Sequence, residues 1–268
     1  MLDITHITRG TSPVSNQKIF SALKSISIKE FMKKGEGNPD LQEDFVNTYL
    51  EWLKGCTVSP VVGLKQFTKT YFVNGVTQSY DIFFWEHKGK RFRVLKGEYP
   101  YVQLSVDNWL HLEDDEIREN DAVVLSCPFY GNGRIPRHFD EILDRCLELN
   151  VPVMIDAAYF GTCYGLAFDY SHPAIEMVSF SLSKPFCIQS YRAGILLSKR
   201  AFGYLEEIQI QAKYFNKFGA YVGLKLMQQF PADFLPSNYK LAHQEICKQL
   251  DLMPTNCIML ANVKHGDN

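Results

Sequence analysis

The middle of this 268-residue chain alternates short apolar runs with helical patterns, and this alternation constrains the fold more than any other feature. Short continuous apolar runs are typical of strands that are buried on both faces of a sheet. After Pro136, apolar residues recur at spacings of three and four, which predicts an amphipathic helix. The predicted buried strands are 122–127, 151–155, 177–181 and 194–197. Strand, helix and strand in this order predict an α/β domain with a mostly parallel sheet.

Segments before this region extend the same pattern. Residues 69–73 and 91–95 are predicted strands, and residues 77–85 between them are a predicted helix. Apolar side chains at helical spacing after Asp40 predict a further amphipathic helix at 41–53.

The two ends of the chain are less regular. The first ~35 residues mix short polar and apolar pieces and predict no particular element. Beyond residue 201 the pattern is helical through 209–229, and we expect Pro231 and Pro236 to break that helix. A second helix is predicted at 238–250 and a final strand at 257–261.

Charge and cysteine content argue against several classes of protein. The 28 lysines and arginines nearly balance 30 aspartates and glutamates, for a net charge of -2, which argues against a broad basic face for nucleic acid. No apolar stretch approaches the ~20 residues of a membrane-spanning helix, and the N-terminus lacks the pattern of a signal peptide. The seven cysteines are widely spaced without a CxxC pair. We therefore expect no disulfide framework or zinc site, but free thiols in a reducing cytoplasm.

Polar side chains follow the predicted strands where each strand ends. Asp156 comes directly after a buried strand, and a carboxylate there needs a cationic partner. Lys184 follows the next strand together with two hydroxyls, and Arg192 lies eight residues further on. The glycine turn at 75–78 leads from a strand into a helix, where free backbone N–H groups favour a phosphate. Because ligands bind beyond the carboxyl ends of such strands, these groups predict a pocket for a phosphate and an electrophile.

Each of these residues also has an ordinary structural explanation. Single lysines and arginines are usually solvated surface charges, and glycine turns between a strand and a helix are common. Tyr99 and Tyr159 could be half-buried packing residues, and Asp156 could be a helix cap. The occurrence of all these groups, in order, in one α/β chain favours a common site.

The same segments resemble the fold-type-I pyridoxal 5'-phosphate (PLP) enzymes, in the class I/II aminotransferase branch. The family's strand ending in Asp-x-x-Tyr is similar to VMIDAAY at 153–159, and its Ser-x-Ser-Lys segment resembles SFSLSKPF at 179–186. The Arg-x-Gly that follows resembles YRAG at 191–194. The phosphate-cup turn resembles NGVTQ at 74–78, and the aromatic segment resembles GEYPY at 97–101.

The resemblance covers roughly residues 40–200 and implies the central chemical roles. Lys184 would form a Schiff base with the cofactor aldehyde and then carry a proton between the substrate and the cofactor. Asp156 would pair with the protonated pyridine nitrogen and keep the ring an electron sink. Tyr159 would donate a hydrogen bond to the phenolic oxygen of the ring.

The remaining cofactor contacts follow from the same resemblance. Arg192 and Ser181 would hold the phosphate together with the turn at Gly75. The other phosphate ligands would be the backbone N–H groups of Val76 and Thr77 and the side chain of Gln78. Tyr99 would stack on the ring, and Tyr101 is the less favoured candidate for that position.

The chain departs from the family pattern at two places. The family usually has Asn-Pro-x-Gly where this chain has SCPFYGNG at 126–133, which puts Tyr130 at the Asn position and Asn132 two residues late. Either the Tyr130 phenol replaces the amide contact to the ring oxygen, or a shifted loop brings Asn132 there. The last arginine is Arg200, so residues 201–268 offer no arginine for a substrate carboxylate. A truncated chain, a short relative with another substrate and a non-catalytic relative are all compatible with that departure.

The resemblance thus implies an aspartate aminotransferase-like large domain and a C-terminal small domain that is short or truncated. The predicted divisions are an N-terminal segment and helix (1–50), a PLP-binding α/β domain (51–205), and a helical connection with a partial small domain (206–268). The implied activity is amino transfer between an amino acid or related amine and a 2-oxo acid, in a cytoplasmic homodimer without nucleic-acid or membrane partners. The alternatives are decarboxylase or lyase chemistry, a non-catalytic PLP-fold protein, and an α/β protein without PLP.

Overall fold

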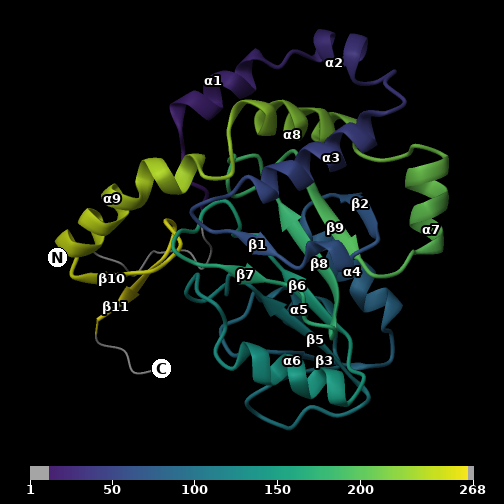
Figure 1. The fold of residues 1–268 in the computed structure, drawn as a ribbon, viewed down its shortest axis with the longest axis vertical. Helices are drawn as coiled ribbons and strands as arrows, with labels where there is room; N and C mark the ends of the chain where they lie inside the picture. Colours follow the sequence, from purple (N-terminus) through teal and green to yellow (C-terminus); the bar gives the residue numbers. More distant parts are fainter. Residues whose placement is uncertain (1–11, 265–268) are drawn as a thin grey trace.

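A seven-stranded sheet forms the centre of the molecule in the computed structural model, which describes residues 12–264 (Figure 1). The strand order is β2-β9-β8-β6-β5-β3-β4. The strands are β2 (Lys69–Val73), β3 (Arg91–Val94), β4 (Trp109–His111), β5 (Asp121–Ser126), β6 (Val153–Asp156), β8 (Ile175–Ser181) and β9 (Gly194–Ser198). β9 runs opposite to the other six strands of this sheet, which are parallel to one another, so the predicted α/β fold with a mostly parallel sheet is confirmed.

The reversed direction of β9 matters for the site. Because β9 runs against the other strands, its first residue lies at the edge where those strands end. Ser181, at the end of β8, pairs with Gly194, at the start of β9. Val73, at the end of β2, pairs with the same glycine. The loop just before β9 therefore joins the loops that follow β2 and β8 at one edge of the sheet.

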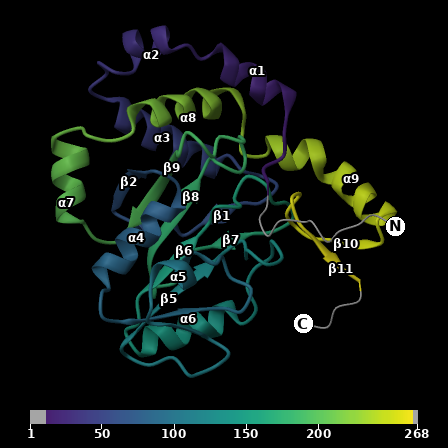
Figure 2. The ribbon, with the colours of Figure 1, turned by 180° about the vertical axis from the view of Figure 1, so that it is seen from behind.

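Helices cover both faces of the sheet and divide the core in two. Alternate residues of β5 face opposite ways, so Val123 and Leu125 pack in one cluster and Ala122 and Val124 in the other. The first cluster contains residues of α3 (Leu41–Lys54), α6 (Phe139–Glu148) and α8 (Lys217–Gln229). The second contains residues of α4 (Val76–Glu86) and α5 (Tyr101–Ser105). Figures 1 and 2 show α3 beside α8 above the sheet.

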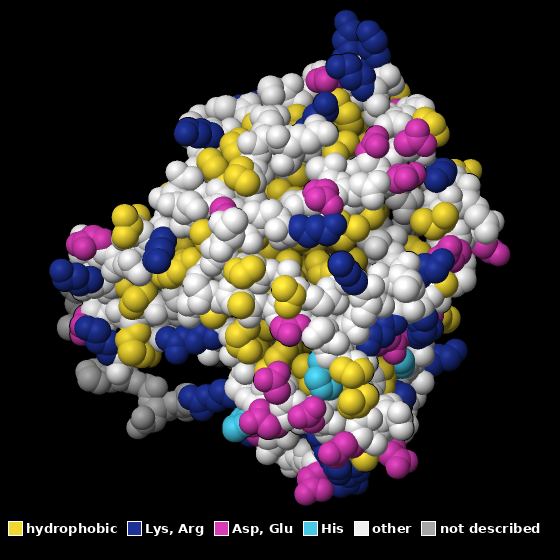
Figure 3. All heavy atoms as spheres, viewed as in Figure 1, with side chains coloured by type: hydrophobic (Ala, Val, Ile, Leu, Met, Phe, Trp, Pro, Cys, Tyr) yellow, Lys and Arg dark blue, Asp and Glu magenta, His cyan; other side chains and the backbone are white. Residues whose placement is uncertain are grey.

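Amphipathic patterns explain why these helices form. In α6, Leu143 and Cys146 are buried against the sheet, whereas Asp140, Glu141 and Asp144 are exposed. Acidic side chains accordingly gather over the lower part of the molecule in Figure 3, where α6 lies in Figure 1. The predicted helices at 41–53 and 77–85 and the six predicted strands of the sheet are confirmed to within two residues.

Several predictions outside the sheet are corrected. Helices α1 (Gln17–Ser25) and α2 (Ile28–Lys34) occupy the N-terminal region that predicted no element. The helix expected to open at Pro136 begins at Phe139, because His138 in the left-handed conformation separates the two. Residues 1–11, including those searched for a signal peptide, and 265–268 lie outside the described residues.

The C-terminal third differs most from expectation. The predicted helix through 209–229 is split into α7 (Gly203–Leu205), the π-helical η2 (Glu206–Gln211) and α8. Asn216 caps the N-terminus of α8, because its side chain accepts a 2.8 Å hydrogen bond from the N–H of Gly219. Pro236 lies in the first turn of α9 (Phe234–Gln249), where a helix needs no N–H donor. The strand predicted at 257–261 is wrong. The observed hairpin pairs β10 (Leu252–Pro254) with β11 (Ala261–Val263).

Smaller features complete the fold. Strands β1 (Val61–Val62) and β7 (Phe168–Asp169) form a parallel pair, and η1 (Leu64–Gln66) follows β1. Among residues 12–264, no helix is both long and apolar enough to cross a membrane. The seven cysteines are free thiols, and the described residues group no set of His, Cys, Asp and Glu that could hold a metal ion. The whole central sheet falls within 51–205, while the domain boundaries themselves stay a prediction.

A buried arginine ties the far edge of the sheet together. Arg93 on β3 is fully buried, and its Nη1 donates 2.7 Å hydrogen bonds to Asp121 Oδ2 and to the carbonyl of Glu116. Its Nη2 donates to the carbonyls of His111, at 3.0 Å, and Asp115. One guanidinium therefore satisfies groups from two strands and the loop between them.

Arg93→Met is expected to lower the free energy of unfolding by about 3 kcal/mol, because it removes a fully buried guanidinium that pairs with the buried Asp121 carboxylate. Arg118→Met is the matched control, since Arg118 pairs with Asp115 at 3.0 Å on the surface with 67% of its side chain exposed. Urea denaturation of both variants measures the difference. Equal destabilisation by the two substitutions would contradict a special role for the buried guanidinium.

Candidate cofactor site

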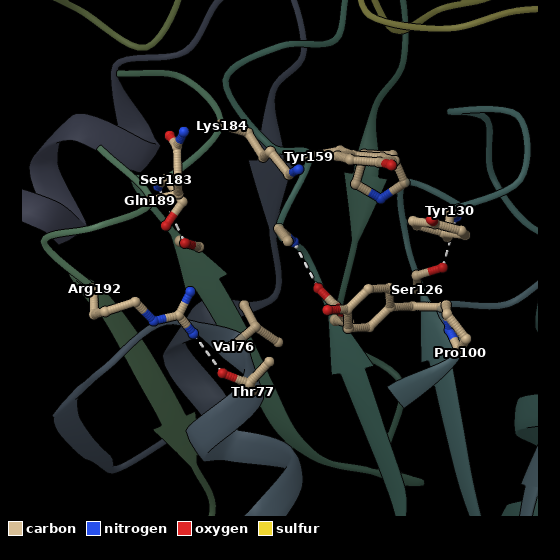
Figure 4. Close-up of a pocket in the computed structure, with 15 residues that line it drawn as sticks. Val76, Thr77, Pro100, Ser126, Tyr130, Tyr159, Ser183, Lys184, Gln189 and Arg192 are labelled. Atoms are coloured by element: carbon tan, nitrogen blue, oxygen red, sulfur yellow. Dashed lines mark hydrogen bonds between the residues drawn. The ribbon is translucent and has the colours of Figure 1, made fainter. Parts of the chain in front are cut away.

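A cavity of about 420 Å³ lies at the edge of the sheet where the parallel strands end (Figure 4). Its walls come from the loops after β2, β3, β5, β6 and β8 and from the loop before β9. In Figure 4, Lys184, Gln189 and Arg192 approach it from one side, and Tyr130, Ser126 and Pro100 form the other. The structure brings these predicted site residues to the cavity lining: Val76, Thr77, Tyr99, Tyr130, Asp156, Tyr159, Ser181, Lys184 and Arg192.

Asp156 ends β6 and is 5% exposed. Its Oδ1 accepts a 2.8 Å hydrogen bond from the N–H of Ala158, and its Oδ2 accepts a 3.0 Å bond from the Tyr80 hydroxyl. Burial raises the pKa of Asp156 to about 6, against the lowering effect of these bonds and of the Lys184 charge. A cation bound in the cavity against this carboxyl would lower its pKa further and favour its charged form.

Lys184 follows β8 and is half-buried in the cavity wall. Burial lowers the pKa of its amine, while the nearby charge of Asp156 opposes that shift. A lowered pKa leaves more of the amine unprotonated, which is the form that attacks a carbonyl carbon. The arrangement therefore suits a nucleophilic lysine beside a buried acid.

Arg192, Thr77 and Gly75 form a cradle for an anion at the start of α4. Arg192 Nη2 donates a hydrogen bond to Thr77 Oγ1 (Figure 4). Gly75 has φ +73, and a Cβ added there would lie 2.7 Å from Arg192 Nη2, so only glycine lets the guanidinium approach. Arg192 itself adopts a left-handed φ of 53, a conformation that non-glycine residues hold mainly where the surrounding structure requires it. The N-terminus of α4 adds free N–H groups to this positive surface.

Gln78 does not line the cavity. Its Oε1 accepts hydrogen bonds from the backbone N–H of Asn74, at 2.7 Å, and from Asn74 Nδ2, at 3.1 Å. The side chain thus closes the turn before α4 instead of pointing toward the cradle. Gly75 does not line the cavity either, and its contribution is to leave space for the Arg192 guanidinium.

Three tyrosines form an aromatic wall. Tyr130 stacks on Tyr159 with ring centroids 6.0 Å apart and an interplanar angle of 15°. The ring centroids of Tyr130 and Tyr99 are 5.3 Å apart. Tyr101 lies outside the cavity lining, and its hydroxyl donates a 2.7 Å hydrogen bond to Asp81.

The two candidates for the family's asparagine are placed differently. Tyr130 lines the cavity, whereas Asn132 accepts a 3.0 Å hydrogen bond from the N–H of Arg134 within its own loop. The geometry therefore favours Tyr130 over Asn132 at this position.

One serine, Ser183, and one tyrosine, Tyr80, extend the predicted set. Ser181 Oγ accepts a 3.1 Å hydrogen bond from the N–H of Ser183. Ser183 Oγ is buried at the cavity and has no hydrogen-bond partner among residues 12–264, so it is a polar atom that a ligand would satisfy. Sequence reasoning missed Tyr80, and it noted the Ser183 hydroxyl beside Lys184 without assigning it a contact to the cofactor. Ser183 directly precedes Lys184 and carried a weak local signal, whereas Tyr80 reaches Asp156 only through the fold.

A buried acid, a nucleophilic amine, an anion cradle and an aromatic wall around one cavity define the class of fold-type-I PLP-dependent enzymes. The unsatisfied Ser183 hydroxyl and the space kept open by Gly75 fit the phosphate of that cofactor. The sequence model of the aminotransferase class I and II family matches residues 90–249, so the chain belongs to that family. A search of curated proteins found no match.

Solved structures of this family share the fold. The aromatic aminotransferase from Pyrococcus horikoshii superposes with a TM-score of 0.65 at 15% identity, over 92% of this chain and 76% of its own. Tyrosine aminotransferase from Leishmania infantum superposes with a TM-score of 0.66 at 11% identity, over 91% of this chain and 77% of its own. The PLP-bound C-S lyase from Staphylococcus hominis superposes with a TM-score of 0.64 at 12% identity, over 92% of this chain and 71% of its own. The family match and the PLP-bound neighbours indicate PLP as the cofactor.

Proposed function

We propose that this chain is a PLP-dependent aminotransferase that moves an amino group between an amino acid, or a related amine, and a 2-oxo acid. The observation that carries the proposal is the common cavity of Lys184, Asp156 and Arg192. These three side chains offer an amine for the cofactor aldehyde, an acid for its ring nitrogen and a guanidinium for its phosphate. The family match to residues 90–249 supports the same activity.

When bound, PLP supplies an aldehyde that takes up amines and a ring that accepts electrons from the reacting carbon. Asp156 keeps a proton on the ring nitrogen, and Tyr159 donates to the ring oxygen. Arg192, Ser181 and the N–H groups of Val76 and Thr77 hold the phosphate. Lys184 Nζ would anchor the cofactor aldehyde, and as a free amine it would carry a proton between the substrate α-carbon and the C4′ carbon of the cofactor.

We propose a cytoplasmic homodimer as the working form. Seven free thiols suit a reducing compartment, and dimerisation follows from the resemblance to the family.

Lyase or decarboxylase chemistry is the second candidate function. Of the described residues, Lys184 and Arg192 are the lysines and arginines that line the cavity, and both are assigned to the cofactor. Among residues 12–264, no further arginine lines the cavity for a substrate carboxylate, and this observation is the reason to test the second candidate. A non-catalytic PLP-binding protein would have the same shortage of cations.

Absorption spectroscopy with a panel of amino donors distinguishes these functions. The purified protein is expected to turn yellow with PLP, and one donor converts the cofactor to its amine form with release of one equivalent of 2-oxo acid. Mass spectrometry of the released cofactor measures that conversion. Substrate cleavage with the cofactor regenerated as aldehyde would instead identify a lyase. A yellow protein that reacts with no donor would contradict both catalytic functions.

A further inference from the structure

A second buried carboxyl, Glu98, lies directly behind the cavity wall. Glu98 follows β3 in the loop that carries Tyr99 and is 4% exposed. It does not line the cavity, and none of the roles described above uses it. A buried carboxyl away from solvent is costly unless hydrogen bonds compensate it, so its partners indicate what it does.

Glu98 joins two separate loops through three hydrogen bonds. Its Oε2 accepts a 2.7 Å bond from the N–H of Ser126, and its Oε1 accepts from the Ser126 hydroxyl. Oε1 also accepts a 2.8 Å bond from the N–H of Tyr99. All three donors are neutral groups of residues that line the cavity.

The connection continues from Ser126 to the aromatic wall and to the buried acid. Ser126 Oγ, which donates to Glu98, accepts a 2.7 Å hydrogen bond from the N–H of Tyr130 (Figure 4). Ser126 also pairs with Asp156 across β5 and β6. One carboxyl thereby holds the backbone of both Tyr99 and Tyr130 at a fixed position relative to Asp156.

We propose that Glu98 is a positioning residue that sets how Tyr99 and Tyr130 lie against the PLP ring, an inference that rests on the proposed function. Hydrogen bonds to a carboxylate are among the stronger bonds a protein makes, so they restrain both loops. Burial also raises the pKa of Glu98 to about 7, and the Asp156 charge adds to that shift. The carboxyl thus belongs to the electrostatic surroundings of the ring as well as to its support.

Glu98→Gln tests this role because glutamine keeps the size of the side chain but has one acceptor oxygen instead of two. Its NH2 group would face an N–H donor, so at least one of the present hydrogen bonds is lost. Glu113→Gln is the matched control. Glu113 also accepts a backbone N–H, that of Lys96, at 3.0 and 3.1 Å, but it is exposed and outside the cavity. PLP titration followed by absorbance gives the Kd, and visible circular dichroism of the bound cofactor reports how its surroundings are arranged.

Glu98→Gln is expected to weaken PLP binding about tenfold and to change the visible circular dichroism, since it breaks charged hydrogen bonds to two walls. Glu113→Gln is expected to leave both unchanged. Should Glu98→Gln fail to fold, Ser126→Ala breaks only the hydroxyl link to Glu98 and Tyr130, and it is expected to change the same dichroism signal. If folded Glu98→Gln has the Kd and the dichroism of the unmodified protein, the inference is overturned and the proposed function is kept. The same holds for Ser126→Ala where that variant is used. Absence of PLP binding by the unmodified protein would overturn the proposed function and this inference together.

Discussion

Lys184→Ala abolishes the covalent capture of PLP. Borohydride reduces the linkage between an amine and the cofactor aldehyde to a stable bond, and within the described part of the chain Lys184 is the lysine that lines the cavity. The unmodified protein is therefore expected to yield one reduced adduct on the peptide that contains residue 184. The variant yields none, and its turnover falls by about 10²–10⁴-fold because the residue that moves the substrate proton is lost.

Lys199→Ala controls for the loss of a partly buried lysine. Lys199 is half-buried, burial also lowers the pKa of its amine, and its Nζ donates a 2.6 Å hydrogen bond to the carbonyl of Pro173 outside the cofactor cavity. Its removal is expected to leave the adduct and the turnover unchanged. Peptide mapping by mass spectrometry measures both variants, and an adduct that persists on another lysine in Lys184→Ala would refute the assignment.

Asp156→Asn lowers turnover by about 10²–10³-fold, the effect of losing one preorganised electrostatic contact to the reacting system. The amide keeps the size of the side chain and one acceptor for Ala158 or Tyr80, but it cannot balance a proton on the ring nitrogen. Asp140→Asn, on the exposed face of α6, is the control and is expected to keep full activity. Single-turnover absorbance with an active donor measures the rate. Near-normal turnover of the Asp156 variant would show that the ring nitrogen needs no acid.

The same substitution changes how stability depends on pH. Asp156 in the protein without cofactor has a pKa of about 6, above the unfolded value of about 3.9. The folded state therefore holds a proton that the unfolded state has lost between these pH values. This contribution to stability is complete below about pH 4 and is lost as the pH rises through about 6, a loss of about 3 kcal/mol.

Thermal unfolding between pH 4 and 7 measures this effect. The cofactor-free protein is expected to lose stability across that range, and Asp156→Asn to lose less. Glu98, with a pKa of about 7, contributes in the same direction. Because the Asp156 charge adds to the Glu98 shift, the difference between the two proteins reports Asp156 together with its coupling to Glu98. Parallel pH profiles for the two proteins would contradict a raised pKa at this residue.

Local sequence patterns were sufficient to predict six of the seven strands of the sheet, all except β4, and the principal candidate residues. Apolar runs such as 122–127 are visible in the sequence because a strand buried on both faces needs apolar residues at every position. Asp156 was found because it directly follows such a run, and Lys184 because it comes three residues after the end of the next one. Contacts within a few residues and the edge shared by parallel strands account for this success.

Contacts between distant segments decided the remainder. The Tyr80 bond to Asp156, the Glu98 bonds to Ser126 and the reversal of β9 join residues far apart in the chain, and no local pattern encodes such pairs. Gln78 had a local alternative in Asn74, and only the folded turn shows which partner it takes.

The sequence by itself thus determined which segments become buried strands and which reactive side chains follow them, because apolar runs and the residues after them are visible in the local sequence. Only the tertiary structure decided that Lys184, Asp156 and Arg192 line one cavity, and that Tyr130 rather than Asn132 reaches it. These outcomes depend on strand order, on β9 running opposite to its neighbours, and on hydrogen bonds between loops, which form only when the whole sheet is packed.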